Sequence, residues 1–281
     1  MALKINEMLL DRVRSLTAHK LDDGELLFRL TSLEDPSLSC TAEGEEIVDA
    51  IGSLITTLYR AKKATFTASN SLISLDLAAA QYGANKQIVG ENNVESIMDY
   101  AYEVLPVVKG GTEDAPTYTV SLANAATTYT DENGEEVSTI KYIYAIENGQ
   151  IGTTYSYNAA VSEKNFTVGK DNKTITMPTG VTSGKIYVEY TYMNTNAMKV
   201  TNRASEFPKA CSVVIYAYFK DVCNENTVYS GKIICPKAKL NPEQVELALT
   251  STGKHAFEFQ MMKDYCADEN EDELFSIIIS Q

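Results

Sequence analysis

Short segments of alternating apolar and polar residues dominate the chain and predict a mainly β protein. Residues 185–192 form the clearest predicted strand, because aromatic side chains alternate there with polar or smaller ones. Residues 211–219 predict a long central strand. Residues 45–49 and 54–59, on either side of a turn at residues 50–53, predict a hairpin.

One segment, residues 71–82, predicts an α-helix, since its Leu and Ile residues recur three and four positions apart. Asn70 or Ser71 is predicted to cap the first turn, because a short polar side chain can accept a hydrogen bond from an unpaired N–H group there. Gly83 lies where a residue in the left-handed conformation would end the helix. We expect the Leu/Ile face to pack on a sheet. Residues 2–20 fit a short helix and a strand equally well.

The density of turn signals rises near residue 103 and falls again after residue 194. Between these points, six or seven short predicted strands are separated by Gly, Asn and Asp turns, which is typical of a small antiparallel β-sandwich. The flanking segments, 1–102 and 195–281, have too few strands individually to bury both faces of a sheet. The pattern therefore predicts one discontinuous β domain, with residues 103–194 inserted into it as a second domain. Such an insertion costs little, because loop-closure entropy grows only logarithmically with length.

The charge of the chain excludes some functions. The 281 residues include 24 Lys and Arg against 38 Asp and Glu, a net charge of −14. This balance argues against ordinary binding of a phosphate backbone, which requires clustered cations. No apolar run approaches the length of a membrane-spanning helix, and the first residues lack the layout of a signal peptide, so we expect no membrane insertion. The five cysteines form no Cys-x-x-Cys pair, which favours assembly in a reducing cytoplasm over a disulfide scaffold.

Catalytic chemistry has few candidates. The two histidines, His19 and His255, lie far apart in the sequence, and Cys266 follows His255 closely enough for a Cys–His pair to be drawn. Since nothing in the sequence orients such a base, we interpret both residues as packing or surface residues. Nucleotide-binding and nucleophile-elbow motifs do not occur. We therefore expect no enzyme activity, no catalytic residues and no cofactor.

Two acidic runs invite a comparison with cation sites. The first comprises Asp264, Asp268, Glu269, Glu271, Asp272 and Glu273, and the second spans residues 131–136. The first run lacks the glycine and the ligand spacing of a calcium loop, so a solvated turn is the favoured interpretation. The second is interpreted as a hairpin tip, with a weak cation site as the alternative. No metal site is predicted.

The chain is rich in tyrosine, with 17 residues, and contains no tryptophan. Seven tyrosines in the insert admit two interpretations: Tyr142, Tyr144, Tyr155, Tyr157, Tyr187, Tyr190 and Tyr192. They could form an aromatic face for a carbohydrate or a partner protein, or they could pack across strands. Packing is favoured for the set, with one or two tyrosines exposed.

Several passages of the flanking segments carry a family resemblance: residues 38–49, 59–69, 72–83, 199–209, 229–239 and 246–253. In their order they resemble the tail tube proteins of tailed bacteriophages. The passage Ile234-Cys235-Pro236-Lys237-Ala238-Lys239, followed by Leu249-Thr250-Ser251-Thr252-Gly253, is the most similar. In the insert, residues 166–168, 174–180 and 185–190 resemble the immunoglobulin-like modules found within phage structural proteins.

The resemblance implies a virion structural protein with a tail-tube-like β-sandwich or barrel and one flanking helix. It implies that six copies form a ring and that rings stack into a hollow tube for DNA ejection. It also implies contacts with other tail proteins and assembly in the cytoplasm of the host bacterium. Residues 20–64 are the best candidate for contacts between rings, because the family is implied to use an equivalent hairpin and an N-terminal arm. The inserted domain cannot fit inside a narrow channel, so we expect it to project outward.

The net charge gives the tube interpretation a specific consequence. Acidic walls repel phosphates, whereas a basic wall would retain the DNA. We therefore expect acids to outnumber bases along the channel wall. The alternative function is that of an adhesin, in which the inserted domain binds carbohydrate and the rest of the chain is its structural platform.

Overall fold

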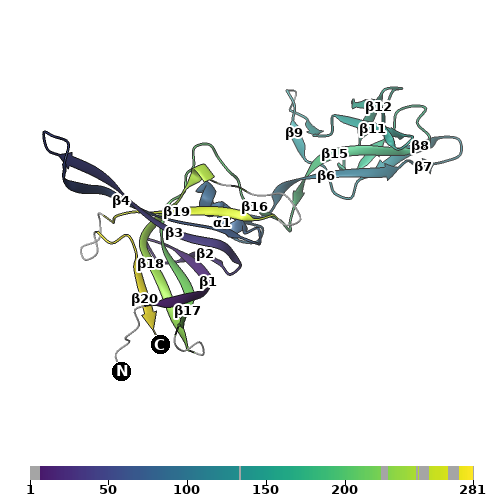
Figure 1. Cartoon of the computed structure of the whole chain (residues 1–281). Coiled ribbons are helices and arrows are strands. Elements are labelled where there is room, and N and C mark those ends of the chain that lie inside the picture. Colours follow the sequence, from purple (N-terminus) through teal and green to yellow (C-terminus); the bar gives the residue numbers. More distant parts are fainter. Residues whose placement is uncertain are drawn as a thin grey trace. The chain divides into compact units, whose positions relative to one another are not determined.

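The structure is a computed structural model that describes residues 7–132, 134–222, 227–244, 246, 253–264 and 272–280. The chain divides into two compact units: unit 1 comprises residues 1–86 and 200–281, and unit 2 comprises residues 87–199. Strands dominate both units, and the described residues contain a single α-helix (Figure 1). The predicted mainly β fold with one helix is confirmed.

Unit 1 is built on one large antiparallel sheet. Its strands are β1 (Met8–Lys20), β2 (Leu26–Leu30), β3 (Leu33–Val48), β4 (Leu54–Asn70), β17 (Ala210–Asp221), β18 (Val228–Leu240), β19 (His255–Met261) and β20 (Ser276–Ser280). They follow the order β2-β1-β17-β18-β19-β4-β3, and β20 also pairs with β18. A short 3-10 helix, η1 (Pro242–Gln244), follows β18. Because β1 pairs with β17, the sheet joins segments that the second unit separates in the sequence.

The core of unit 1 lies on one face of this sheet and contains a group of aromatic rings. Phe257 and Phe259 of β19 are in edge contact, with ring centroids 5.8 Å apart. Phe259 also lies 6.4 Å from Phe28 of β2, and Phe257 lies 6.4 Å from Phe66 of β4. These rings are buried, so strands from both ends of the chain share one hydrophobic core.

The helix of unit 1, α1 (Leu75–Tyr82), begins later than its periodicity predicts. Ser74 caps it, because the Ser74 hydroxyl accepts a hydrogen bond from the N–H of Leu77 at 3.2 Å. The predicted caps, Asn70 and Ser71, are therefore wrong: Asn70 ends strand β4 and Ser71 follows it. Asn70 pairs with His255 of β19 instead. Because His255 lies far away in the sequence, local spacing cannot predict this pairing.

The predicted packing of the Leu/Ile face of the helix on the sheet is confirmed only in part. Leu77 is fully buried in the core of unit 1. By contrast, Leu72 and Ile73 precede the helix and are exposed. The late start of the helix removes these two side chains from the face that packs on the sheet.

Unit 2 contains twelve strands among its described residues. They are β5 (Gln87–Ile88), β6 (Ile97–Pro106), β7 (Val108–Gly111), β8 (Pro116–Ser121), β9 (Thr128–Thr130), β10 (Glu136–Ser138), β11 (Tyr142–Glu147), β12 (Gln150–Tyr157), β13 (Asn165–Val168), β14 (Thr174–Thr176), β15 (Lys185–Asn194) and β16 (Met198–Lys199). Eight of them follow the order β6-β15-β11-β12-β13-β14-β8-β7, while β9 pairs with β10 and β5 with β16. The β12–β13 pair is parallel, a departure from the wholly antiparallel arrangement expected. The core of this unit includes Ile143, Phe166, Ile175 and Val188.

The units divide at other residues than the sequence pattern suggests. Strand β6 pairs with β15 along its whole length, from Ile97 opposite Asn194 to Pro106 opposite Lys185. Unit 2 therefore takes in residues 87–102 and 195–199, which the sequence pattern assigns to the outer domain. The outward projection of the inserted domain stays a prediction.

The end of α1 provides a stability test at Gly83. This residue has φ 67°, as predicted for a C-terminal glycine, and a Cβ atom added there would lie 2.1 Å from the carbonyl oxygen of Phe207. The left-handed conformation costs a non-glycine residue about 1–2 kcal/mol, and the clash adds to this. We expect Gly83→Ala to lower the free energy of unfolding by more than about 2 kcal/mol, measured by urea denaturation.

Gly52 is the matched control, because it also has a positive φ, 86°, but a Cβ atom would meet nothing within 4 Å. Gly52→Ala should incur only the conformational cost. Equal destabilisation by the two substitutions would show that the contact with Phe207 is unimportant.

Candidate assembly surfaces

The central part of the β3–β4 hairpin extends beyond the rest of the sheet. Strand β19 pairs with β4 only at residues 65–70, so in the described chain residues 40–64 pair only with one another. We call residues 40–63 the arm. The arm extends from the sheet as a two-stranded ribbon (Figure 1). Nearly every side chain of the arm is exposed, on both faces of the ribbon. An isolated two-stranded ribbon is marginally stable in water, so the arm is a candidate for packing on a partner.

The tip of the arm is an ordered turn, as the sequence predicts. The N–H of Asp49 donates to the carbonyl oxygen of Ser53 at 2.9 Å. The Asp49 carboxylate accepts hydrogen bonds from the N–H groups of Ile51 and Ser53, at 3.0 and 2.7 Å. Ile51 is nevertheless 88% exposed. The turn therefore holds an apolar side chain in solvent in a fixed position.

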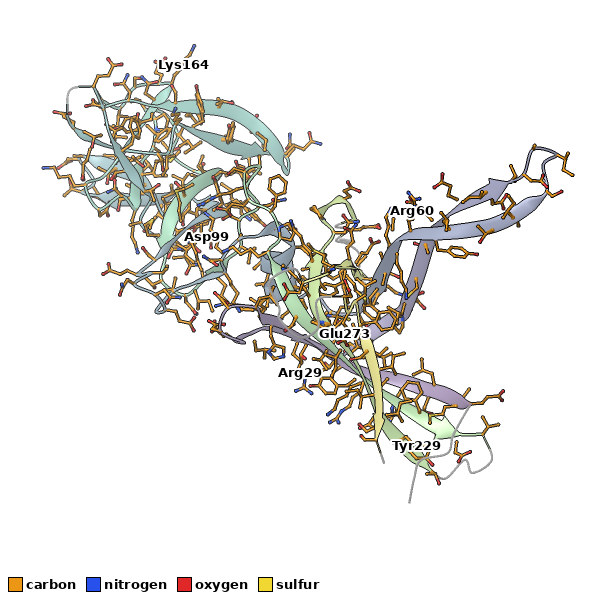
Figure 2. The ribbon with its side chains drawn as sticks, turned by 90° about the vertical axis from the view of Figure 1, so that its left-hand side faces the viewer. Arg29, Arg60, Asp99, Lys164, Tyr229 and Glu273 are labelled. Carbon is orange, nitrogen blue, oxygen red and sulfur yellow. The ribbon has the colours of Figure 1, made fainter. Side chains whose placement is uncertain are left out.

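Apolar side chains cover the outer part of the arm. Besides Ile51, they are Ile47, Val48, Leu54, Ile55, Leu58 and Tyr59. Nearer the sheet, ion pairs cross the ribbon, with Lys63 Nζ 3.1 Å from Glu43 Oε1 and Arg60 Nη2 3.4 Å from Glu45 Oε2. Arg60 lies on the arm (Figure 2). A concentration of exposed apolar residues is a property of interaction sites in soluble proteins.

The other end of the unit 1 sheet has two open edges within the described part of the chain. Strand β2 pairs only with the Leu16–His19 part of β1, which leaves one side of Met8–Val13 unpaired. On the opposite side, β20 pairs with β18 alone. Exposed apolar residues, Leu9 and Ile278 among them, lie on these two edge strands. Edge strands with free N–H and C=O groups are ready to pair with another chain.

Basic side chains gather on the part of this sheet formed by β1, β2, β17 and β18, on the side that points away from the core. They include Arg12, Arg14, Arg29, Lys220 and Lys232. The guanidinium groups of Arg12 and Arg14 lie over the ring of Tyr218, at 5.5 and 5.9 Å from its centroid. Asp11 pairs with Lys220, with 2.7 Å between Nζ and Oδ1, and that pairing lowers the pKa of the Asp11 carboxyl. We call this surface the basic face.

His255, a candidate base in the sequence, holds the helix to the sheet. Its side chain is buried, and Nε2 lies 2.6 Å from Oε1 of Gln81 in α1. Its Nδ1 accepts a hydrogen bond from the backbone N–H of Ser74 at 3.4 Å, which places the proton on Nε2. Gln81 in turn donates to the carbonyl oxygen of Ala256 at 3.0 Å. Burial lowers the pKa of His255, so the imidazole is neutral and structural.

The remaining chemical candidates are placed as follows. Cys266, the proposed partner of His255, lies outside the described residues. Burial raises the pKa values of Cys211 and Cys235 to about 12, which leaves both thiols protonated and unreactive. His19 lies at the β1–β2 turn, with Nδ1 3.2 Å from the carbonyl oxygen of Gly24.

The acidic runs do not form a cation site in the described part of the chain. Within it, no three His, Cys, Asp or Glu side chains are grouped to hold a metal ion. Asp264 pairs with Lys237 at 2.9 Å, and Asp272 pairs with Lys263. Asp268, Glu269 and Glu271 lie outside the described residues. In the second run, Asp131 closes a hairpin turn, because its carboxylate accepts the N–H of Glu135 at 2.9 Å.

The seven tyrosines of the insert divide between the two interpretations. Tyr190 is buried, and Tyr155, Tyr157 and Tyr192 pack against the core of unit 2. Tyr142, Tyr144 and Tyr187 lie outside that core, and Tyr142 is exposed. Two further exposed tyrosines on β6, Tyr100 and Tyr102, were absent from the predicted set. The alternation of residues 98–105 places both tyrosines on one face of a strand but does not tell which face is covered.

An ordered apolar arm and two open sheet edges are features of a protein that builds a larger assembly. The described chain also contains no helix long and apolar enough to cross a membrane. A family model for the YomU/Tube protein family matches residues 8–274, so the chain belongs to that family. The family confirms the resemblance to phage tail tube proteins and gives the chain a structural role in the phage tail. A comparison with curated proteins found no match.

The buried imidazole makes stability depend on pH. The unfolded chain binds a proton at the ordinary pKa of histidine, about 6.5, whereas folded His255 binds it only at lower pH. The contribution to stability is therefore complete above about pH 6.5 and is lost as the pH falls through the lowered pKa. Urea unfolding between pH 5 and 8 should show this decrease in the wild type, and His255→Asn should flatten it.

His19→Asn is the control, because the His19 side chain is partly exposed at a turn. This variant should keep the pH dependence of the wild type. If stability still decreases at low pH in His255→Asn, other titrating groups cause the decrease.

Proposed function

We propose that copies of this chain join into a ring and that the rings stack into the hollow tube of a phage tail, through which DNA passes. The observation that carries this proposal is the arm, an ordered ribbon whose apolar tip has no partner within the described chain. Assembly takes place in the cytoplasm of the host bacterium, together with other tail proteins. Six copies per ring is the number that the tail tube resemblance implies.

The open edges support ring formation. A closed ring requires two different, complementary surfaces on each subunit. The Met8–Val13 edge of β1 and the free side of β20 meet this requirement, because they lie on opposite sides of the same four strands. Backbone hydrogen bonds between β1 of one copy and β20 of the next would remove both edges. The ring is then a sheet continued from subunit to subunit.

The arm supports stacking. The ribbon extends beyond the sheet of its own unit, and its tip is preorganised by the Asp49 turn. Preorganisation reduces the entropy lost when the tip binds. The apolar tip, centred on Ile51, would bury its surface against the ring above or below, and that contact would also stabilise the ribbon.

The charge of the channel wall depends on which surface faces the DNA. The sequence predicts that acids outnumber bases there, and this stays a prediction. The basic face does not have the composition predicted for the wall, since basic side chains predominate on it. An acidic wall therefore requires the basic face to point away from the channel, because a wall of cations would retain phosphates.

The proposal as a whole is tested on purified wild-type protein. Size-exclusion chromatography with light scattering and negative-stain imaging, at high concentration and with tail completion proteins added, should reveal rings and tubes. A strict monomer under all these conditions would count heavily against the proposal.

Substitutions in the arm should separate stacking from ring formation. In the double variant Ile51→Ser with Leu54→Ser, the tip loses its apolar surface while both positions remain exposed. We expect rings but no tubes in negative-stain images. The free energy of unfolding should change by less than about 0.5 kcal/mol, because exposed side chains contribute little to the fold.

The matched control changes the same residue types elsewhere in unit 1. Leu72→Ser with Ile73→Ser alters two exposed side chains before α1. This variant should form tubes like the wild type. Tubes in the arm variant, or equal losses in both variants, would refute the role of the arm.

Charged side chains placed on the open edge of β1 should block ring formation, the step that precedes stacking. Leu9 and Leu10 are exposed on the unpaired part of β1, and natural proteins protect such edges with lysine. Leu9→Lys with Leu10→Lys should therefore prevent ring formation and leave monomers in light scattering. Met198→Lys, at an exposed position of unit 2, is the control and should leave rings intact. Normal rings in the edge variant would exclude β1 as a joining edge.

A further inference from the structure

One face of the unit 2 sheet carries a group of tyrosine rings that the core does not use. On β6, Tyr100 and Tyr102 are 79% and 74% exposed. Tyr187 of β15 lies beside them, and Tyr142 and Tyr144 follow on β11. We call these five residues the tyrosine face.

Three rings of the tyrosine face contact one another across three strands. The ring centroids of Tyr102 and Tyr187 are 6.3 Å apart, and those of Tyr144 and Tyr187 are 6.1 Å apart. The hydroxyl of Tyr187 donates a hydrogen bond to the carboxylate of Glu189 on the same strand. The central ring is thus held from three sides. A binding surface ordered in this way loses little side-chain entropy when a ligand arrives.

Packing within the unit does not explain these rings. The hydrophobic core lies on the opposite face of the same strands, where Ile143 and Val188 are fully buried. The Tyr190 side chain also lies on the core side, where its hydroxyl donates a hydrogen bond to the Glu103 carboxylate. Burial and this hydrogen bond raise the pKa of Tyr190 to about 12. Exposed rings on the other face leave apolar area in water, which is typical of a binding site.

The chemistry of the face favours a neutral ligand rich in hydroxyl groups. Besides the tyrosines, the exposed ionisable side chains along β15 are Lys185 and Glu189, whose charges cancel. The exposed positions of β6 that alternate with the inward ones, from Met98 to Val104, carry no charge at all. A surface without clustered cations, on a chain of net charge −14, does not attract nucleic acid or anionic lipid.

Carbohydrate has the properties that this surface can recognise. A pyranose ring presents an apolar C–H side that can stack on an aromatic ring, and hydroxyl groups around its rim. The tyrosine hydroxyls and the Glu189 carboxylate can bond with those hydroxyls. We propose that the tyrosine face binds uncharged polysaccharide, with Tyr100, Tyr102 and Tyr187 stacking on successive sugar rings. This inference concerns unit 2 alone and goes beyond the proposed function in tube assembly.

The test compares three forms of the full chain. The probes are a glycan array of hexose and N-acetylhexosamine oligosaccharides and affinity electrophoresis in gels containing soluble β-glucan. Wild type should bind, and Tyr100→Ala with Tyr102→Ala should weaken binding about tenfold or more, as expected for the loss of two stacked rings. Tyr100→Phe with Tyr102→Phe keeps the rings and should retain most of the affinity.

Tyr129→Ala is the matched control, because Tyr129 is an exposed tyrosine of β9 in the same unit, outside the tyrosine face. It should bind like the wild type. Circular dichroism should show the same β content in all variants. Since the chain has no tryptophan, its tyrosine fluorescence reports binding directly.

Three results would overturn the inference. The first is absence of wild-type binding to every array sugar and to β-glucan. The second is wild-type affinity in the double alanine variant. The third is that the double alanine variant loses self-association in light scattering, or adsorption to phosphatidylglycerol vesicles, while sugar binding is absent. The sugar-binding outcomes do not bear on the proposed function, because tube assembly is measured separately by imaging. Loss of self-association in the double alanine variant would instead assign the tyrosine face to contacts between copies.

Discussion

Within the described residues, a single copy of this chain leaves backbone groups of its main sheet unpaired and apolar side chains exposed, and the proposed assembly depends on these groups. The first half of β1 and the whole of β20 each have a free side in the described chain, and the arm extends as a ribbon without a covering layer. Unpaired edges and exposed apolar side chains are costly in a protein that works alone. In a polymer the same groups become the contacts between subunits.

The hydrophobic core of unit 1 explains how the fold tolerates unpaired edges and an uncovered arm. Strands from both ends of the chain meet in one core around Phe259, and the buried pair of His255 and Gln81 holds α1 to β19. Unit 2 has a core of its own, so the interruption of unit 1 leaves the β1–β17 pairing intact. The stable core can therefore carry an arm and two edges that, in the proposed assembly, would be packed by neighbouring copies.

The predictions that succeeded rest on local signals. The turn around Asp49, the end of α1 at Gly83 and the long strand predicted at residues 211–219 each follow from a few adjacent residues. The failures involve partners distant in the sequence. Strand β4 continues through the polar stretch at residues 60–63 because β3 pairs with it there, although that stretch resembles a loop.

The candidate surfaces divide in the same way. The hairpin was predictable from its turn, and its exposure on both faces was not, because alternation alone does not tell whether a second layer covers a strand. The early start of unit 2 follows from the β6–β15 pairing, which spans about 90 residues of sequence and leaves no local trace. Likewise, Tyr100 and Tyr102 look like core residues until the sheet shows which side is covered.

Net charge is a weak guide to the charge on the wall of the proposed channel, because charges act over short distances in salt solution. At physiological ionic strength the Debye length is about 8 Å, so acids on one side of a β domain barely affect DNA on the other. The deciding quantity is the charge of the surface that faces the DNA. On the basic face, stacking of Arg12 and Arg14 on Tyr218 and pairing of Lys220 with Asp11 occupy several cations but do not reverse the sign. A charge of −14 is therefore compatible with both a repelling and a retaining wall, and the orientation of this one face decides between them.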